Sequence, residues 1–437
     1  MRKALNPTRD TEEEEQARKI EVQRWLDNYS KWLLSEDREL PNFVELENEW
    51  STLFNAYVWN NDIYHKLLLH SLLGQLLRNL RLVKGGIKID GRTSTLIIQD
   101  QGTAKDVPLV PFAQLCKALD RWMIENGINR RLRYTQNLTD FTQAALIGSI
   151  EEIVHRDRSI ERRDIRGVLH RDVSDFIEIQ EGRRVLALGS KLDDYTIQYI
   201  NNSLSSIHTG NAQRKMLRSG EVVCESVCSY LITSYPTEEM SIELLHSGFF
   251  RRFLVHYNPI PPDEKFHNMI RGTEQLPKSH DAIEATNRAV EISLKVITRF
   301  LTKLITRYAN QPYIDIIITE KAEQQLKSTI NGWREITKNE LSKEVGDILF
   351  AFVDSYINTH AVVIAGHRAL VDGRDTITET DIIYSLTIVN KLLSELSLLV
   401  ERIIGTQSNY YRNLERDELF SLSQICWYLN STSLRLG

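Results

Sequence analysis

Apolar residues recur at helical spacing in two parts of the chain. From residue 42 to residue 81 they stand three or four positions apart, at Leu46, Trp50, Leu53, Tyr57, Tyr64, Leu67, Leu68, Leu72, Leu76 and Leu80. This period predicts two or more core helices, which the pair Gly85-Gly86 ends. Residues 281–309, 340–371 and 380–404 show the same period. The segment from Thr376 to Asp381 has the form of a capping box, so a helix is predicted to begin near Glu379.

Short β-like runs separate these helical parts. Ile87 and Ile89 precede Gly91, and a longer run extends from Val222 to Ser234. The apolar run from Leu96 to Ile98 comes directly before a polar segment, Gln99 to Lys105, that contains a glycine. A strand, a glycine-containing turn and a helix, in this order, are the setting that a phosphate-binding loop requires.

The residues after this strand are candidates for such a loop. In a phosphate loop, backbone N–H groups and a helix N-terminus surround the phosphates, and a lysine neutralises their charge. A following serine or threonine holds magnesium. Gly102, Thr103, Ala104 and Lys105 supply the loop and the lysine. The alternative interpretation is an ordinary turn between a strand and a helix.

The string from Gly102 to Lys105 resembles the Walker A motif of the minichromosome maintenance helicases, which are P-loop ATPases of the AAA+ class. In that motif the loop opens with glycine and serine follows the lysine, whereas this chain has Gln99 and Asp106. The Gln99 side chain crowds the tight turn, and the Asp106 carboxylate either replaces the hydroxyl on magnesium or repels the phosphates. The resemblance implies ATP and Mg²⁺ as cofactors.

A later segment resembles the Walker B strand of the same class. The segment from Gly167 to Asp172 is apolar at its start and ends in an aspartate. The resemblance implies that Asp172 is a catalytic residue that positions magnesium, while Val173 stands where the class has a glutamate. Asp175 is a further acid within reach of such a site. The alternative is a surface turn with scattered acids.

Three further positions match motifs of AAA+ proteins. Thr233 or Ser234, at the end of a β-like run, is the candidate for the polar sensor 1 residue. The segment from Ser247 to Tyr257 resembles the arginine-containing loop and strand of phage and mobile-element primase-helicases, which implies that Arg252 is an arginine finger. The alternative is a solvated basic turn. Lys343 stands near the place of a sensor 2 arginine, although lysine offers only a point charge.

The resemblance implies a fold and a division of the chain. The expected fold class is α/β, a P-loop NTPase of AAA+ type, in which helices cover both faces of a parallel sheet. The expected parts are a flexible tail and leading helix at 1–40, a helical segment at 41–90, the α/β core at 91–270, an α-helical lid at 271–404 and a C-terminal tail at 405–437. The segment from Asp417 to Gly437 resembles the first helix of a winged-helix module. Either that module is incomplete or this is a packing helix.

Composition limits the environment and the partners. The chain has 437 residues, of which 42% are hydrophobic and 26% charged, as in a globular protein. It lacks an uninterrupted apolar run of about eighteen residues and an apolar signal region near its start, so we expect a cytoplasmic protein without membrane association. The four cysteines, Cys116, Cys224, Cys228 and Cys426, lack zinc spacing and are expected to be core thiols. The net charge of -5 means that nucleic-acid binding must rest on local basic patches.

Two basic segments are candidates for contact with DNA. Arg214, Lys215 and Arg218 precede the turn signal Ser219-Gly220, in the region where related helicases project a hairpin into the central pore. The second cluster, Arg156, Arg158, Arg162, Arg163 and Arg166, is interrupted by acids and is interpreted as a salt-bridged surface helix.

Three functional classes stay open at this point. The first is a helicase-like AAA+ motor or subunit of a viral or mobile-element replication system, which binds ATP and single-stranded or forked DNA as a homo-oligomeric ring. The second is a catalytically decayed AAA+ scaffold, loader or DNA-binding subunit, for example in a hetero-oligomer with an active ATPase. Gln99, Asp106 and Val173 favour the second class, whereas Lys105, Asp172 and Arg252 favour the first. The third is a helical interaction protein, which predicts no parallel sheet.

Overall fold

The structure is a computed structural model of the chain. It describes residues 42–55, 62–78, 80–84, 87–100, 105–139, 141–155, 158–186, 194–204, 213–217, 220–236, 245–246, 248–259, 280–308, 311 and 314–407. Several predictions lie outside these residues. They are the tail and leading helix at 1–40, the winged-helix segment near the C-terminus, Gly102, Thr103 and Ala104 of the loop, Arg218 of the first basic segment and Arg156 of the second.

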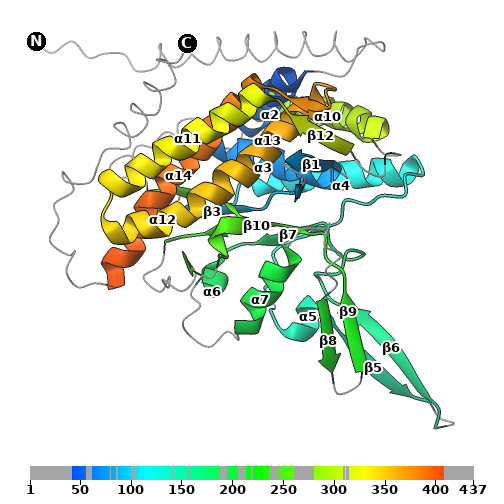
Figure 1. The fold of residues 1–437 in the computed structure, drawn as a ribbon. Coiled ribbons are helices and arrows are strands. Elements are labelled where there is room, and N and C mark those ends of the chain that lie inside the picture. The colour runs from blue at the N-terminus through cyan, green and yellow to red at the C-terminus, as the bar shows by residue number, and fades with distance from the viewer. Residues whose placement is uncertain are drawn as a thin grey trace, which may run out of the picture.

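Five parallel strands form the central sheet (Figure 1). In chain order they are β3 (Thr95–Gln99), β4 (Tyr134–Thr135), β7 (Phe176–Ile179), β10 (Ser229–Ser234) and β11 (Leu254–Asn258). Across the sheet the order is β11-β3-β10-β7-β4, and every neighbouring pair is parallel. β3, β7 and β10 are buried along their whole length, as strands covered on both faces are. The helical interpretation without a parallel sheet is therefore wrong.

Helices cover this sheet on two sides. α2 (Phe43–Asn55), α3 (Asp62–Leu76) and α4 (Leu109–Glu125) precede or follow β3 in the chain. The ring of Phe112 in α4 packs between Trp50 of α2 and Phe176 of β7, with centroid distances of 6.3 and 5.3 Å. α6 (Arg183–Leu186) and α7 (Asp194–Ser203) lie below the sheet in Figure 1 and the large helical layer lies above it. The described part of the chain thus has an α/β architecture.

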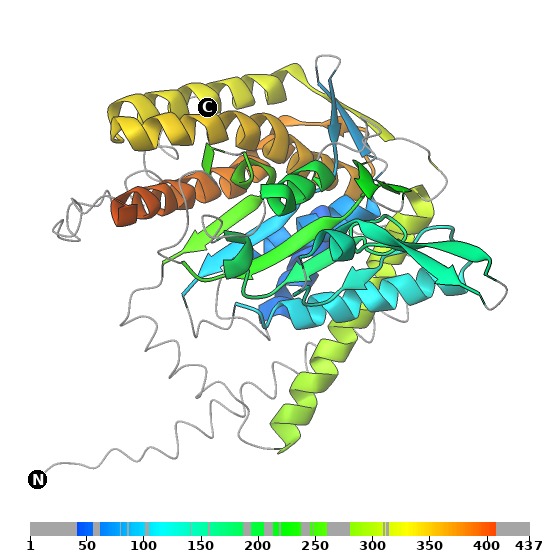
Figure 2. The same cartoon turned by 90° about the horizontal axis from the view of Figure 1, so that it is seen from below.

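The helices predicted over 281–309, 340–371 and 380–404 are confirmed. They are α10 (His280–Tyr308), α12 (Lys343–Ser355), α13 (Val362–Val371) and α14 (Glu379–Gln407), and a π-helical turn, η3 (Tyr356–Ala361), joins α12 to α13. A further helix, α11 (Glu320–Asn339), was not predicted. The capping box is also confirmed, because the Thr378 N–H donates to Asp381 Oδ2 at 2.9 Å and α14 begins at Glu379. In Figure 2, α11, α12 and α14 lie side by side along one side of the sheet, and α10 lies apart from them, across α4.

A second, smaller sheet joins the beginning of the described chain to this helical layer. Its order is β13 (Thr376–Ile377), β12 (Ile314–Ile318), β1 (Leu80–Lys84) and β2 (Ile87–Asp90), with β1 and β12 parallel. The predicted strand at Ile87 and Ile89 is confirmed. The helical prediction for Leu80 is wrong, because Leu80 opens β1 and pairs with Ile314. The segments at 41–90 and 271–404 therefore pack together as one layer.

Two helical stretches have the length and apolarity of membrane-spanning helices. They are Lys343–Val371 and Glu379–Gly405, with mean hydropathies of 1.5 and 1.4. In each, 67% of the apolar window is buried inside the protein. Buried core helices of water-soluble proteins reach the same length and apolarity.

Two β-hairpins project from the core beside each other (Figure 1). One consists of β5 (Gly148–Val154) and β6 (Ile160–Arg166), and the other of β8 (Gln213–Leu217) and β9 (Gly220–Cys224). The prediction of a helix for the second basic cluster is wrong, because Arg162, Arg163 and Arg166 lie on β6. The ion pairs expected there form across the hairpin instead, with Arg162 Nε 3.0 Å from Glu152 Oε1.

Candidate functional site

The candidate phosphate-binding residues that follow β3 in the chain lie at the carboxyl end of the central sheet. β3 ends at Gln99, and its neighbours β10 and β11 end at Ser234 and Asn258. In register, Asn258 lies beside Gln99 and Ser234 beside Ile98, so the three strands end at one level. The chain passes from β10 across β3 to reach β11, and ligands of open parallel sheets bind outside the carboxyl ends at such a reversal.

Lys105 stands at the start of the helical turn that follows β3. The turn from Lys105 to Pro108 leads into α4, and the Leu109 N–H donates to the Asp106 carbonyl at 3.1 Å. The Tyr64 hydroxyl of α3 donates to the Lys105 carbonyl at 2.6 Å, which anchors the turn to the helical layer. The Lys105 ammonium is 3.7 Å from Asp106 Oδ2. This lysine therefore lies in the turn between β3 and the start of α4, with its charge partly neutralised by the next residue.

Thr233 is the residue of β10 that faces this turn. Its hydroxyl donates to Asp106 Oδ1, and its side chain is buried. Ser234, the other sensor 1 candidate, donates instead to the carbonyl of Tyr235 at 3.2 Å. The structure thus brings Thr233, and not Ser234, to Asp106 and Lys105.

Glu178 is an acid near this site that the sequence interpretation missed. It lies on β7, is 1% exposed, and accepts hydrogen bonds from the Tyr134 hydroxyl at 2.5 Å and from Gln180 Nε2 at 2.6 Å. Burial, with a smaller contribution from the nearby Asp106 carboxylate, raises the pKa of Glu178. The signal for a buried strand was the string Phe176-Ile-Glu-Ile179, in which only the glutamate interrupts apolar residues.

Gln180 and Glu181 directly follow β7, which ends at Ile179. Glu181 is exposed and has a positive φ of 50°, a backbone conformation that residues other than glycine rarely adopt. Gly182 follows and donates its N–H to the Thr233 carbonyl at 2.7 Å, so this turn lies against the end of β10. Strained backbone of this kind is frequent at functional sites.

A buried hydrogen-bonded chain links the end of β3 to helix α14. Gln99 Nε2 is 3.4 Å from His256 Nε2 on β11, and His256 Nδ1 is 2.6 Å from Glu395 Oε2 on α14. All three side chains are at most 5% exposed. The Gln99 side chain therefore points toward the helical layer, where it links the loop after β3 to the helices above the sheet.

Asp172 is not part of this site. Residues 168–173 form turns, and the Walker B strand predicted at 167–172 is wrong because the strand of this region is β7. Asp172 precedes β7 and so lies toward the amino end of the sheet, whereas Lys105 follows β3 at the carboxyl end. Its carboxylate, with a side-chain exposure of 45%, pairs with Arg166 at the base of the hairpin. The Asp175 carboxylate, also before β7, pairs with Arg78 at 3.0 Å.

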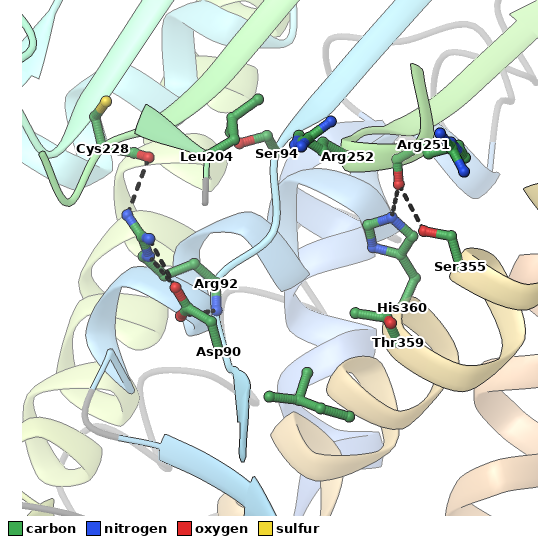
Figure 3. Close-up of a pocket in the computed structure, with 11 residues that line it drawn as sticks. Asp90, Arg92, Ser94, Leu204, Cys228, Arg251, Arg252, Ser355, Thr359 and His360 are labelled. Carbon is green, nitrogen blue, oxygen red and sulfur yellow. Dashed lines mark hydrogen bonds and ion pairs between the residues drawn. The ribbon is translucent and has the colours of Figure 1, made fainter. Parts of the chain in front are cut away.

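Arg252 also lies at the amino end of the sheet. It closes a short 3-10 helix, η2 (Phe250–Arg252), directly before β11, and its side chain donates to the Gly248 carbonyl at 2.9 Å. Arg252, Arg251, Arg92 and His360 are among the residues that line a pocket of about 280 Å³ (Figure 3). Arg92 is held there by Asp90, whose Oδ2 lies 2.7 Å from its guanidinium. The structure thus separates Arg252 from the Lys105 of the same chain by the length of the strands.

The remaining predicted residues lie apart from Lys105. Arg214 and Lys215 are on β8, opposite Val223 and Val222 of β9, so the hairpin predicted for this segment is present. Lys343 is exposed in the first turn of α12, and no described residue forms an ion pair with it.

The hairpin of β5 and β6 carries apolar residues as well as arginines. All of β6 is exposed, and Val154 and Ile160, which pair at the outer end of the hairpin, are 68% and 61% exposed. At its base, Gly148 has a φ of 122°, and a Cβ there would lie 2.3 Å from the Ile165 carbonyl oxygen. Only glycine fits this position, so the hairpin leaves the core at a fixed point.

Within the described residues, no cluster of three or more His, Cys, Asp or Glu side chains forms a metal cage. Magnesium in nucleotide sites is commonly held by one or two carboxylates together with the phosphates, so the fit rests on individual oxygens. The Asp106 carboxylate and the Thr233 hydroxyl are hard oxygen donors beside Lys105, and they suit Mg²⁺.

No model of a known protein family matches the chain, and no curated protein sequence matches it.

Proposed function

We propose that this chain is a nucleotide-binding subunit of the AAA+ class, which binds ATP with Mg²⁺ beside Lys105 and assembles with further subunits on single-stranded DNA. The observation that carries the proposal is the position of Lys105. It lies in the turn that joins β3 of a parallel sheet to α4, and the end of the neighbouring strand β10 contacts this turn through Thr233. A helix N-terminus with a lysine at this position binds phosphate through backbone N–H groups and charge.

The strand order supports the class. Numbered by their order in the chain, the strands run 5-1-4-3-2 across the central sheet, with the loop-bearing strand between the fourth and the fifth. The P-loop ATPases of the AAA+ class, which the sequence motifs resemble, arrange their core strands in the same order. A parallel sheet by itself occurs in many enzymes, so the order and the lysine together carry more weight than either alone.

The residues around Lys105 fit defined roles in this proposal. Asp106 supplies an oxygen for Mg²⁺ in place of the usual serine, and Thr233 holds the Asp106 carboxylate in position. Gln180 and Glu181 directly follow the third strand, β7, near the place where the Walker B motif has Asp-Glu, so in this proposal Glu181 takes the role of the glutamate that polarises the attacking water. When bound, Mg²⁺ neutralises phosphate charge that Asp106 and Glu178 otherwise repel.

The two hairpins supply the surface for DNA in this proposal. Both project from the same side of the core, and they carry Arg214, Lys215, Arg162 and Arg163 on β8 and β6. Arginine and lysine side chains bind the phosphates of a single strand without reading its sequence. The exposed Val154 and Ile160 at the outer end of one hairpin add an apolar surface for bases.

A second candidate function is a subunit that binds nucleotide but does not hydrolyse it. Gln180 favours this alternative, because an amide replaces the carboxylate that positions magnesium in active ATPases. The ion pair of Lys105 with Asp106 favours it as well, because it weakens the charge available to the phosphates. In this version the chain serves as a scaffold or loader beside an active ATPase.

One titration tests the proposed function. The full chain is titrated with fluorescent ATP in the presence of Mg²⁺ or EDTA, with and without single-stranded DNA. We expect saturable binding that requires Mg²⁺ and that becomes tighter with DNA. Absence of binding with Mg²⁺ and DNA at millimolar nucleotide contradicts the proposal. Release of phosphate in the same samples distinguishes the motor from the non-hydrolysing subunit.

A further inference from the structure

The short helix that carries Arg252 is held by the helical layer. Ser355, the last residue of α12, donates its hydroxyl to the Arg251 carbonyl at 2.9 Å. His360 Nε2, in the π-helical turn η3, donates to the same carbonyl at 3.0 Å. Figure 3 shows both side chains converging on this oxygen. One backbone carbonyl next to Arg252 thus accepts two hydrogen bonds from residues about a hundred positions further along the chain.

Tyr356 holds the residues on the other side of Arg252. Its hydroxyl donates to the Phe253 carbonyl at 2.8 Å and accepts from the Val255 N–H at 3.1 Å. Burial raises the pKa of Tyr356, so this hydroxyl keeps its proton and can donate. Burial also lowers the pKa of His360 to about 4, so its ring is neutral at physiological pH. The contacts of this clamp, defined as Ser355, Tyr356 and His360, therefore do not depend on titration near pH 7.

The clamp lies in a segment with unusual geometry. η3 is a π-helical turn between two α-helices, and such turns are rare and often found at functional sites. A π turn rotates the following residues relative to the preceding ones, which lets Tyr356 and His360 face η2 together. On its other side η2 is tied to the core, because the Leu254 N–H donates to the Ser94 carbonyl at 2.8 Å. The turn that carries Arg252 therefore bridges the sheet and the helical layer.

The same helical layer is linked to the nucleotide site. Gln99, at the start of the loop, reaches Glu395 on α14 through His256. His256 lies on β11, and the first residues of β11 are those that Tyr356 holds. Glu395 of α14 thus contacts the middle of β11 through His256, and Tyr356 of η3 holds the beginning of the same strand.

We propose that Ser355, Tyr356 and His360 are positioning residues for Arg252. The helical layer of one subunit thereby fixes the position of the arginine that this subunit presents to its neighbour. The inference rests on the proposed function, since it requires a neighbour whose nucleotide Arg252 reaches. In this arrangement nucleotide beside Lys105 shifts the helical layer, and the clamp transmits that shift to the backbone on both sides of Arg252. Subunits in an assembly are thereby coupled through a defined set of hydrogen bonds.

The test uses the full chain with the double substitution Ser355→Ala and Tyr356→Phe, which removes two hydroxyls and leaves Arg252 intact. Tyr308→Phe is the matched control, because the Tyr308 hydroxyl donates to the Leu370 carbonyl at 3.0 Å within the same helical layer but away from η2. Ser355→Thr keeps the hydroxyl and serves as the conservative variant. Binding of fluorescent ATP and sedimentation with Mg²⁺, ATP and single-stranded DNA are measured for each.

We expect the double variant to bind ATP within about twofold of wild type but to need an about tenfold higher concentration to assemble, a change of about 1.4 kcal/mol. Tyr308→Phe and Ser355→Thr should assemble like wild type. Adding unlabelled Lys105→Ala chain should return the labelled double variant to the assembled species, because that chain presents an intact Arg252 to the variant's bound nucleotide. A purely structural defect is not rescued in this way.

The outcomes separate the inference from the proposed function. If Arg252→Ala weakens assembly but the double variant assembles like wild type, the clamp has no positioning role and the inference is overturned. Failure of the Lys105→Ala chain to rescue the variant also overturns it. If wild type does not assemble with nucleotide, or Arg252→Ala assembles normally, the proposed function fails and the inference fails with it. Should the double variant not fold, the single variants Ser355→Ala and Tyr356→Phe carry the same test.

Discussion

The carboxylate of Asp106 should have opposite effects on nucleotide binding with and without magnesium. Asp106→Asn removes its charge but keeps its size and an oxygen for the Thr233 hydroxyl. Without Mg²⁺, the wild-type carboxylate neutralises Lys105 and repels the phosphates, so the variant should bind ATP more tightly. With Mg²⁺, the variant loses an anionic ligand of the ion and should bind ATP more weakly.

The magnitude follows from the distance and the exposure of the pair. Lys105 Nζ and Asp106 Oδ2 are 3.7 Å apart, and the Asp106 side chain is 36% exposed. Two unit charges about 4 Å apart interact by about 1 kcal/mol in water and by about 4 kcal/mol at an effective dielectric constant of about 20. Because solvent reaches Asp106, the lower figure applies, which corresponds to an about fivefold change in Kd in each direction.

Isothermal calorimetry of ATP binding in EDTA and in Mg²⁺ measures both changes. Asp172→Asn is the matched control, because Asp172 is an exposed aspartate at the opposite end of the sheet. We expect the control to have the wild-type Kd under both conditions. Equal affinity of Asp106→Asn and wild type for ATP, both with and without Mg²⁺, would refute the role of Asp106. A change in the Kd of the Asp172→Asn control would mean that Asp172 belongs to the site.

Three further changes should have distinct effects. Lys105→Ala should raise the Kd for Mg²⁺-ATP at least tenfold, about 1.4 kcal/mol, in the same calorimetric titration, because a charge-assisted contact is lost. Gln99→Gly should lower the free energy of unfolding in urea by about 2 kcal/mol, because it leaves a cavity and removes the hydrogen bond to His256. Burial raises the pKa of Glu178, so the folded chain holds that proton to higher pH than the unfolded chain, and the group costs stability as pH rises. The stability of Glu178→Gln relative to wild type should therefore increase from about pH 4 to about pH 7 in urea titrations.

The parts of the fold that depend on local pattern could be predicted from the sequence. The run from Leu96 to Ile98 forms β3, and the helical periods of the last third form α10, α12, α13 and α14. The strands β8 and β9, which flank the predicted turn signal, pair as a hairpin. Each of these features is decided by neighbouring residues, so the periodicity carried the information.

The strand predicted at 167–172 was misplaced because the strand of this region, β7, holds an acid. Glu178 interrupts the apolar run of β7, and a buried glutamate is expected to be excluded from a central strand. It is tolerated because Tyr134 and Gln180 donate hydrogen bonds to both of its oxygens. Tyr134 comes from another strand, so the compensation cannot be read from the segment itself.

The contacts between distant segments could not be predicted from the sequence pattern either. β1 pairs with β12, and Gln99 reaches Glu395 through His256, although these residues are far apart in the chain. Gln99 was interpreted as a side chain that crowds the loop, but it points toward the helical layer. Periodicity within one segment gives no information on which distant segment covers it.

A structure of the full chain with a non-hydrolysable ATP analogue, Mg²⁺ and single-stranded DNA tests the central claim most directly. The account predicts that the phosphates lie against the first turn of α4, with the Lys105 ammonium within about 3 Å of a phosphate oxygen. It also predicts that Arg252 of an adjacent subunit approaches the same nucleotide. A nucleotide bound elsewhere, for example in the pocket beside the Arg252 of its own chain, would contradict the account.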